Sequence, residues 1–302
     1  MKHKVNSISD YHRLAGLSKP EHPLVSLVDY GRVQYQTDDE EITVIQGNYT
    51  IALKRGVQGK MRYGQQSYDF DEGLMSFVGP GQVITVKAHY KPEEKPSGWI
   101  LLIHPDFLWN TPLARKIKEF EFFGYGINEA LFLSEKEETS MINIMKSIQG
   151  EYHQNIDQFS QKIIISQIET LLNYAERFYQ RQFITRKITN HEVLTKVETY
   201  LEAYFEQDNL ASLGLPSVQV IADTMNLSAN YLSSLLKVLT GQNTQQHIHE
   251  KLIEKAKEYL STTQLQVSEI AYSLGFEHSQ SFSRLFKSKV QLSPLEFRQS
   301  FN

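Results

Sequence analysis

Two stretches near the C-terminus share one order of apolar, small and turn-forming residues, and each continues into a segment with a polar side. Residues 221–227 align with residues 270–276, and residues 232–237 align with residues 282–287. Each copy predicts a short helix, a tight turn and a second helix. The second helices carry Asn, Gln, Ser, Arg and Lys, which are the residue types that hydrogen-bond to DNA base edges and to phosphates.

The residues at the turns fit this geometry. Ala222 and Ala271 are small where two helices must approach closely. Asn226 and Gly275 tolerate the left-handed conformation that ends a helix, and Ser228 can cap the helix that follows. The residues expected to face outward are Asn230, Ser233, Ser234 and Lys237 in the first copy and Ser279, Gln280, Ser283, Arg284 and Lys287 in the second.

One helix is expected to join the two copies. Residues 244–260 have helical periodicity, and such a helix is roughly 26 Å long at 1.5 Å per residue. A joining helix of that length would separate the second helix of one copy from that of the other by about one turn of DNA, about 34 Å. A single copy would also fit an enzyme or a scaffold, but two matched copies favour a protein that reads two successive major grooves.

The chain from about Asn190 to its end resembles the DNA-binding domain of the AraC/XylS family of bacterial transcription regulators. The residues that carry the resemblance are Ile221-Ala222, Leu227-Ser228, Tyr231-Leu232-Ser233, Leu236-Lys237, Thr240-Gly241, Glu254, Ala256, Val267-Ser268-Glu269-Ile270-Ala271, Leu274-Gly275-Phe276, Ser281-Phe282-Ser283-Arg284, Leu285-Phe286-Lys287, Ser293-Pro294 and Phe297-Arg298. The base contacts that it implies are Asn230, Ser233, Ser234, Ser279, Gln280, Ser283 and Arg284. The phosphate contacts that we expect are Ser217, Lys237, Ser268 and Lys287.

Two positions depart from the family pattern. Gln291 stands where many members have Gly, so a left-handed helix end there would be strained or remodelled. Leu252, beside Lys251, stands where many members have Arg, which puts in doubt one electrostatic contact of the joining helix. Ser293-Pro294 still predicts a capped final helix.

The first hundred residues follow another periodicity. Short stretches rich in Val, Ile, Tyr and Phe alternate with glycines, which predicts an all-β sandwich or barrel. These stretches are residues 24–30, 42–54, 59–63, 73–78 and 98–103. With Asp71-Glu72-Gly73 and Gly79-Pro80-Gly81 at its turns, this half is similar to the cupin-like barrel that often precedes the DNA-binding domain in that family and commonly binds an effector. No residue can be assigned to effector binding.

Two amphipathic helices follow the β-rich part. Ser134 and Glu137 have the spacing of a capping box, and a second helix is expected from about residue 157 to 186. Their apolar sides either pack on the β-domain or form a homodimer interface, and both alternatives satisfy the pattern. Asn190 is expected to cap the next helix.

These patterns predict an α+β chain of two domains. Residues 1–185 are expected to form a cupin-like β-barrel with a helical hairpin, for effector binding and dimerisation. Residues 190–302 are expected to form an all-α double helix-turn-helix domain. Its first helix-turn-helix is expected at about 217–240, its linker helix at about 244–261 and its second helix-turn-helix at about 267–290.

Composition excludes several classes of protein. The 302 residues contain no cysteine, which excludes disulfides, thiolate metal sites and cysteine nucleophiles. His89 and His104 stand alone, so we expect no metal, no cofactor and no enzymatic activity. The start of the chain is polar, and the longest apolar run is about five residues. We therefore expect a cytoplasmic protein without a membrane segment.

The net charge of −4 opposes binding to nucleic acid when the chain is taken as a whole. The charge is unevenly divided, because residues 217–302 carry eight Lys and Arg against seven Asp and Glu. We therefore expect modest non-specific affinity for DNA and strong reliance on base readout or dimerisation.

The sequence thus predicts a sequence-specific DNA-binding transcription regulator, controlled by a small molecule and acting as a dimer. The partners expected are double-stranded promoter or operator DNA, a small-molecule effector, a second copy of the chain and, for an activator, RNA polymerase. The alternative is a cupin-type small-molecule-binding protein or enzyme whose helical half mediates protein contacts.

Overall fold

A computed structural model describes most of the chain. The described residues are 2–35, 37, 40–55, 61–63, 66–68, 73–87, 97–126, 129–154, 157, 159–185, 187–207 and 209–300. The chain divides into two compact units, Met1–Gln182 and Phe183–Asn302. Each unit is described by itself.

The N-terminal unit contains the strands, which form three sheets. Their bounds are β1 (Lys2–Val5), β2 (Val25–Asp29), β3 (Glu41–Gln46), β4 (Tyr49–Arg55), β5 (Met61–Tyr63), β6 (Gln66–Tyr68), β7 (Leu74–Val78), β8 (Val83–Lys87), β9 (Ser97–Ile103) and β10 (Leu131–Phe132). The sheet orders are β1-β3-β8, β10-β7-β4-β9-β2 and β5-β6. The β1–β3 pair is parallel and the other pairs are antiparallel.

The three-stranded and five-stranded sheets face each other across one core. Val44 of β3, Ala52 of β4 and Ile100 of β9 belong to the same buried cluster. Side chains alternate between buried and partly exposed along β3, as expected for a strand with one face in a core. Among the described strands no ladder joins one sheet to the other. The described strands therefore form an N-terminal β-sheet region, and the cupin-like barrel stays a prediction.

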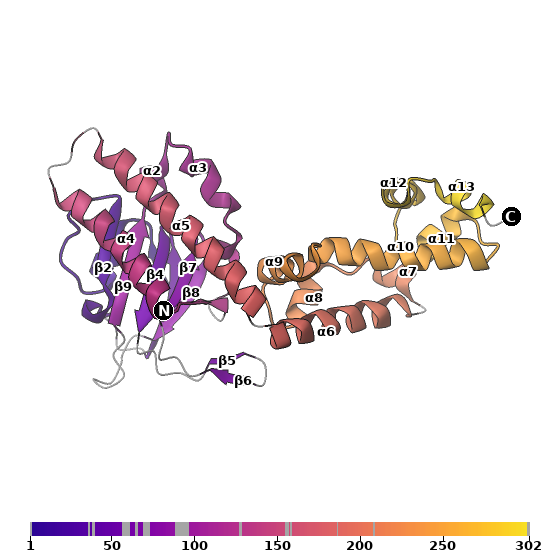
Figure 1. The fold of residues 1–302 in the computed structure, drawn as a ribbon, viewed down its shortest axis with the longest axis horizontal. Coiled ribbons are helices and arrows are strands. Elements are labelled where there is room, and N and C mark those ends of the chain that lie inside the picture. The colour runs from indigo at the N-terminus through magenta and orange to yellow at the C-terminus, as the bar shows by residue number, and fades with distance from the viewer. Residues whose placement is uncertain are drawn as a thin grey trace. The chain divides into compact units, whose positions relative to one another are not determined.

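Helices cover this β-region. Those of the N-terminal unit are α1 (Ile8–Leu14), α2 (Pro105–Leu108), α3 (Leu113–Lys116), α4 (Glu135–His153) and α5 (Ser160–Thr185), with 3-10 turns η1 (Tyr30–Arg32), η3 (Ile117–Glu119) and η4 (Glu121–Gly124). The predicted capping box at α4 is confirmed, because Ser134 and Glu137 bond each other's backbone N–H. Helix α4 packs against β2 and β9, and α5 runs beside α4 (Figure 1). One alternative for the hairpin, packing on the β-region, therefore holds for α4.

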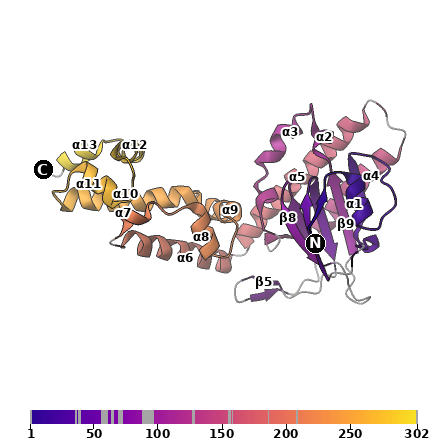
Figure 2. The same ribbon diagram turned by 180° about the vertical axis from the view of Figure 1, so that it is seen from behind.

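The C-terminal unit is entirely helical in its described part. Its helices are α6 (Lys187–Phe205), α7 (Leu210–Leu213), α8 (Val218–Thr224), α9 (Ala229–Thr240), α10 (Thr244–Thr262), α11 (Val267–Ser273), α12 (Ser279–Val290) and α13 (Pro294–Gln299). Helix α10 contacts α6 and α9 as well as α11 and α13, so it joins two helical arms (Figure 2). Leu252, in place of the family's Arg, is fully buried on α10, while Lys251 bridges Glu202 and Glu254 at 3.3 Å each.

One predicted cap is wrong. Asn190 does not begin a helix but lies inside α6, with 2% of its surface exposed. Its amide nitrogen donates to the carbonyl oxygen of Phe183 at 2.6 Å. A buried amide requires such a partner, and the hydrogen bond ties α6 to Phe183 in the last turn of α5. No helix among the described residues is long and apolar enough to cross a bilayer.

Candidate nucleic-acid interface and ligand cavity

Capping residues and turns orient α9 and α12. The Ser228 hydroxyl accepts a hydrogen bond from the Tyr231 N–H at 3.2 Å and starts α9. Asn226 and Gly275 adopt left-handed conformations, with φ of 56° and 85°, in the turns before α9 and α12. Ala222 and Ala271 are fully buried, as close helix packing requires. These features confirm the residue roles that the sequence predicts for the two turns.

The second turn packs closely against the backbone of Gly214. A Cβ atom on Gly275 would lie 2.8 Å from the carbonyl carbon of Gly214. Only glycine has both the left-handed conformation and the space for this contact. Gly275 therefore sets how closely α11 and the segment after α7 approach.

Five of the predicted contact residues are exposed on the second helices. On α9 these are Asn230 and Lys237, and on α12 they are Gln280, Arg284 and Lys287. The three on α12 are spaced by four and three residues, so they share one side of the helix. Among the described residues, no ion pair holds Lys237, Arg284 or Lys287. Their charges are therefore available to a polyanion.

The predicted serines are less accessible. Ser233 and Ser283 are half-buried; the Ser233 hydroxyl lies 3.1 Å from that of Thr244, and the Ser283 hydroxyl donates to the Ser279 carbonyl at 3.0 Å. Ser234 is only 9% exposed. Its position on α9 matches that of Arg284 on α12, but in the folded chain Ser234 belongs to the core. The surface that the structure offers on α9 is therefore built on Asn230, Lys237 and, at its edge, Ser233.

Two further predicted residues lie at helix starts. Ser217 is exposed, and its hydroxyl accepts from the Val220 N–H at 3.2 Å at the start of α8. Ser268 is half-buried in the first turn of α11, which Gln266 begins. His278 is exposed at the start of α12.

The final predicted departure, Gln291, keeps the left-handed conformation at a φ of 65°. Its N–H bonds the Lys287 carbonyl at 2.9 Å, and its side-chain amide donates to the Ser288 carbonyl at 3.1 Å. The helix end is thus strained but not remodelled, because the side chain adds a local hydrogen bond that glycine could not.

A cavity of about 190 Å³ lies between the two facing sheets of the N-terminal unit. Its lining includes Gln46 of β3 and Thr50 of β4, which are 2% and 6% exposed. The Gln46 Oε1 and Thr50 Oγ1 atoms have no hydrogen-bond partner within the part of the chain that the structure describes. Burying polar atoms without partners costs free energy, so these two atoms fit a ligand that supplies hydrogen bonds.

Aromatic residues complete the wall of this cavity. Tyr11 and Tyr30 are buried, and burial raises the pKa of Tyr11 well above its usual value. The Lys54 Nζ atom lies 4.6 Å from the centre of the Tyr30 ring. No carboxylate lines the cavity among the described residues. The wall therefore suits a neutral or anionic molecule that donates hydrogen bonds.

Metal-ligating residues do not gather in the described part of the chain, where no three His, Asp or Glu side chains lie together. His104 begins α2, and its Nδ1 atom accepts from the Asp106 N–H at 3.2 Å. The other histidine singled out by the sequence, His89, lies outside the described residues.

Comparison with known proteins identifies the C-terminal helices. Residues 221–300 match the model of a family described as helix-turn-helix domain. The chain is 31% identical over 161 residues to an uncharacterised HTH-type transcriptional regulator, YfiF, of Bacillus subtilis, an alignment that covers 53% of this chain and 48% of that protein. It is 26% identical over 271 residues to the HTH-type transcriptional activator RhaS of Shigella sonnei, which covers 84% of this chain and 93% of that protein.

Among solved structures, the C-terminal domain of the two-component response regulator yesN from Fusobacterium nucleatum is 30% identical, covering 34% of this chain and 93% of that chain with a TM-score of 0.30. The chain spans about half the length of the first curated relative, YfiF. YfiF is named as a transcriptional regulator and RhaS as a transcriptional activator.

Proposed function

We propose that the whole chain is a sequence-specific transcription regulator of the AraC type, because residues 221–300 match a helix-turn-helix domain model and the relatives that align with the chain are HTH-type transcriptional regulators. In this proposal α9 and α12 enter two successive major grooves of promoter or operator DNA. The doubled helix-turn-helix, with Asn230, Gln280 and Arg284 exposed on its second helices, is the observation that carries the proposal.

The chemistry of the exposed side chains divides them into candidate base contacts and candidate phosphate contacts. Arg284 suits a bidentate contact to guanine, and Asn230 and Gln280 suit adenine. Lys237 lies about two turns beyond Asn230 and Lys287 about one turn beyond Arg284. Both suit phosphates, which position the protein without specifying sequence. Ser233, Ser279 and Ser283 would make shorter-range contacts at the edge of this surface, and Ser217 and Ser268 would meet phosphates.

The N-terminal unit would control the regulator by binding a small molecule. We assign the cavity between its facing sheets, a cupin-like arrangement, to a small-molecule effector. Gln46 and Thr50 would accept and donate hydrogen bonds that the unliganded protein leaves unmade. Tyr11 and Tyr30 would provide aromatic surface.

Dimerisation would use the solvent side of α5. Phe159, Ile163 and Tyr174 are 57%, 41% and 38% exposed. Residues 163 and 174 are eleven apart, about three helical turns, so they share a side of the helix. Apolar side chains at such spacing favour burial against a second copy, and a dimer would place four reading helices on one operator.

Footprinting on genomic DNA, with and without candidate effectors, tests this function directly. We expect protection of two adjacent major-groove segments per chain and a change in occupancy when an effector binds. Selection from random sequences that yields no preferred site would contradict the proposal.

The alternative of a cupin-type enzyme whose helical half contacts proteins predicts the opposite results. It requires turnover or a tightly held metal, together with a helical unit that does not select DNA sequences. Metal analysis and the same footprinting experiment separate the two.

A further inference from the structure

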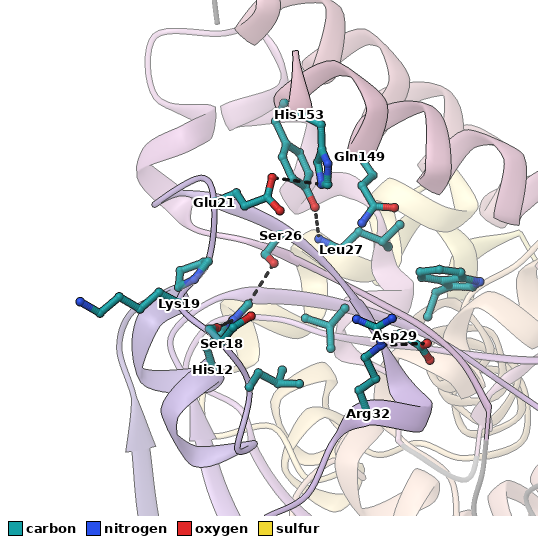
Figure 3. A pocket seen from close by; sticks show the side chains of 15 residues that line it. His12, Ser18, Lys19, Glu21, Ser26, Leu27, Asp29, Arg32, Gln149 and His153 are labelled. Carbon is teal, nitrogen blue, oxygen red and sulfur yellow. Dashed lines mark hydrogen bonds and ion pairs between the residues drawn. The ribbon is translucent and has the colours of Figure 1, made fainter. Parts of the chain in front are cut away.

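A second cavity in the N-terminal unit shares no lining residue with the cavity between the sheets. Its volume is about 370 Å³. Figure 3 shows its walls, which come from the loop after α1 with Ser18 and Glu21, from β2 and η1, and from the last turn of α4 with Gln149 and His153. The cavity lies outside the facing sheets, so a ligand there would not compete directly for the first cavity.

The floor of this cavity is polar and buried. His12 and Ser26 are 8% and 5% exposed. The His12 Nδ1 atom lies 2.6 Å from the Ser18 carbonyl oxygen, which can only accept, so this nitrogen carries a proton and donates. The His12 Nε2 atom lies 3.0 Å from the Ser26 hydroxyl. The network fixes the Ser26 side chain, which projects from β2, against His12.

The Tyr152 side chain extends this network toward α4. Its hydroxyl oxygen accepts from the Leu27 N–H at 2.9 Å. Burial raises the pKa of Tyr152, and hydrogen bonds from Leu27, Gln149 and Ser26 oppose the rise. At neutral pH the phenol therefore keeps its proton and remains a donor as well as an acceptor. The floor thus offers both donors and acceptors of hydrogen bonds.

Each end of the cavity carries one carboxylate beside a basic side chain. At one end the Glu21 carboxylate lies 3.3 Å from His153, and at the other the Arg32 guanidinium lies 3.6 Å from Asp29. Figure 3 shows the two pairs on opposite sides of Ser26, with the Lys19 side chain extending away from the cavity. The Arg32 side chain is 80% exposed, so its contact with Asp29 is loose and contributes little.

We propose that this cavity binds a small zwitterion of amino-acid or dipeptide chemistry, with its carboxylate at Arg32 and its ammonium group at Glu21. A simple anion would face the carboxylates of Glu21 and Asp29, and a simple cation would face Arg32. A zwitterion satisfies both ends at once, and the planar guanidinium matches a carboxylate in a bidentate geometry. Its polar backbone would lie over Ser26 and Gln149.

The two tryptophans of the chain allow a direct measurement. Trp99 lines the cavity, whereas Trp109 is 77% exposed elsewhere in the unit. In the W109F protein, indole fluorescence reports Trp99 alone. The probes are the L-amino acids and glycylglycine, with N-acetylglycylglycine lacking the ammonium group and glycylglycinamide lacking the carboxylate. We expect a saturable change with at least one zwitterion and affinity lowered about tenfold or more by removal of either charge.

Charge-removing variants locate the site. R32Q should weaken zwitterion binding about tenfold or more, and E21Q should do the same. Both residues are exposed, so folding is retained, and thermal unfolding checks this. R13Q is the matched control, because Arg13 is 79% exposed on α1 and pairs with Asp10 outside the cavity. The proposal is overturned if no zwitterion changes Trp99 fluorescence up to about 10 mM, or if R32Q and E21Q bind as R13Q does. The titration needs no DNA, so its failure leaves the proposed regulator function intact.

Discussion

Arg284 and Lys237 are both exposed cations on second helices, but we expect them to act differently. Arg284→Ala removes the bidentate guanine contact that its place on α12 allows. DNA binding should weaken by about 1–3 kcal/mol and specificity should relax at one base. Competition binding against operators substituted at each position measures this.

Lys237→Ala should instead weaken binding to all sequences alike. The slope of log affinity against log salt should become shallower by about one. If the Arg284 and Lys237 variants show the same specificity and the same salt slope, the division into base and phosphate contacts is wrong.

Thr50 allows a test of the cavity between the sheets. Thr50→Val keeps the shape and removes a buried hydroxyl for which the described residues supply no hydrogen-bond partner. We expect the unliganded protein to gain on the order of 1 kcal/mol and its response to an effector to disappear. Thermal unfolding with and without effector measures both. Thr43→Val is the control, because the Thr43 hydroxyl is exposed beside that of Thr85; destabilisation by Thr50→Val alone would argue against an unsatisfied hydroxyl.

The exposure of individual site residues could be predicted from the sequence wherever it depends only on spacing along one helix. Asn230, Gln280 and Arg284 follow from helical periodicity alone. Ser234 does not, because its burial depends on packing between helices that the sequence does not fix. Likewise, alternation along a strand places Gln46 and Thr50 inward but cannot show that they lack partners.

The close packing of α11 against the segment after α7 depends on Gly275. Gly275→Ala adds the cost of a left-handed conformation, about 1–2 kcal/mol, to a collision with the Gly214 backbone. Gly241→Ala has the matched conformation, with a φ of 81°, and nothing within 4 Å of the added Cβ. Chemical denaturation should show a larger loss for Gly275→Ala. Equal losses would mean that the close approach does not matter.

The folding stability that helix α10 contributes should decrease in acid, because two of its histidines have lowered pKa values. Burial lowers the pKa of His247, although Glu250 and Glu198 oppose the shift, and burial together with Lys289 lowers the pKa of His249. A lowered folded-state pKa means that the unfolded chain binds protons first. The neutral forms of His247 and His249 therefore contribute their full stabilisation above the ordinary histidine pKa, about 6.5. That contribution declines as the pH falls through this value.

Denaturation midpoints measured between about pH 7.5 and 5.5 check this. They should fall on acidification, and His247→Gln should flatten the dependence. His191→Gln, at an exposed position on α6, should leave it unchanged. A pH dependence unaffected by His247→Gln would contradict the assignment.

The sequence predicts the helices of the C-terminal unit better than the strands of the N-terminal unit. Residues 42–54 form one β-rich stretch in the sequence, broken by Gly47, and the structure has β3 and β4 there with a turn between them. The turn is held by the Gly47 N–H donating to the Val5 carbonyl at 2.7 Å, a contact with β1 that no local pattern reveals. Helices α8 to α13 were predictable because nearly every one begins with its own side-chain cap.

For the whole molecule, the distribution of charge governs DNA binding. Residues 217–302 have almost balanced charge, and few cations lie on α9 and α12. We expect a salt slope of only about −2 to −4 per chain, because each neutralised phosphate contributes roughly −0.9. Affinity measured from about 50 to 200 mM salt tests this. A much steeper slope would show that cations outside the two second helices dominate.

The strand register has a consequence for how the chain acquires its structure. Val25 pairs with Ile103 and Asp29 with Trp99, so the five-stranded sheet must close a loop of about 70 residues before β2 is held. The C-terminal helices need mostly local contacts, which form faster. After dilution from denaturant, DNA binding should therefore return in an early kinetic phase, and the cavity between the sheets should become able to bind ligand in a later one.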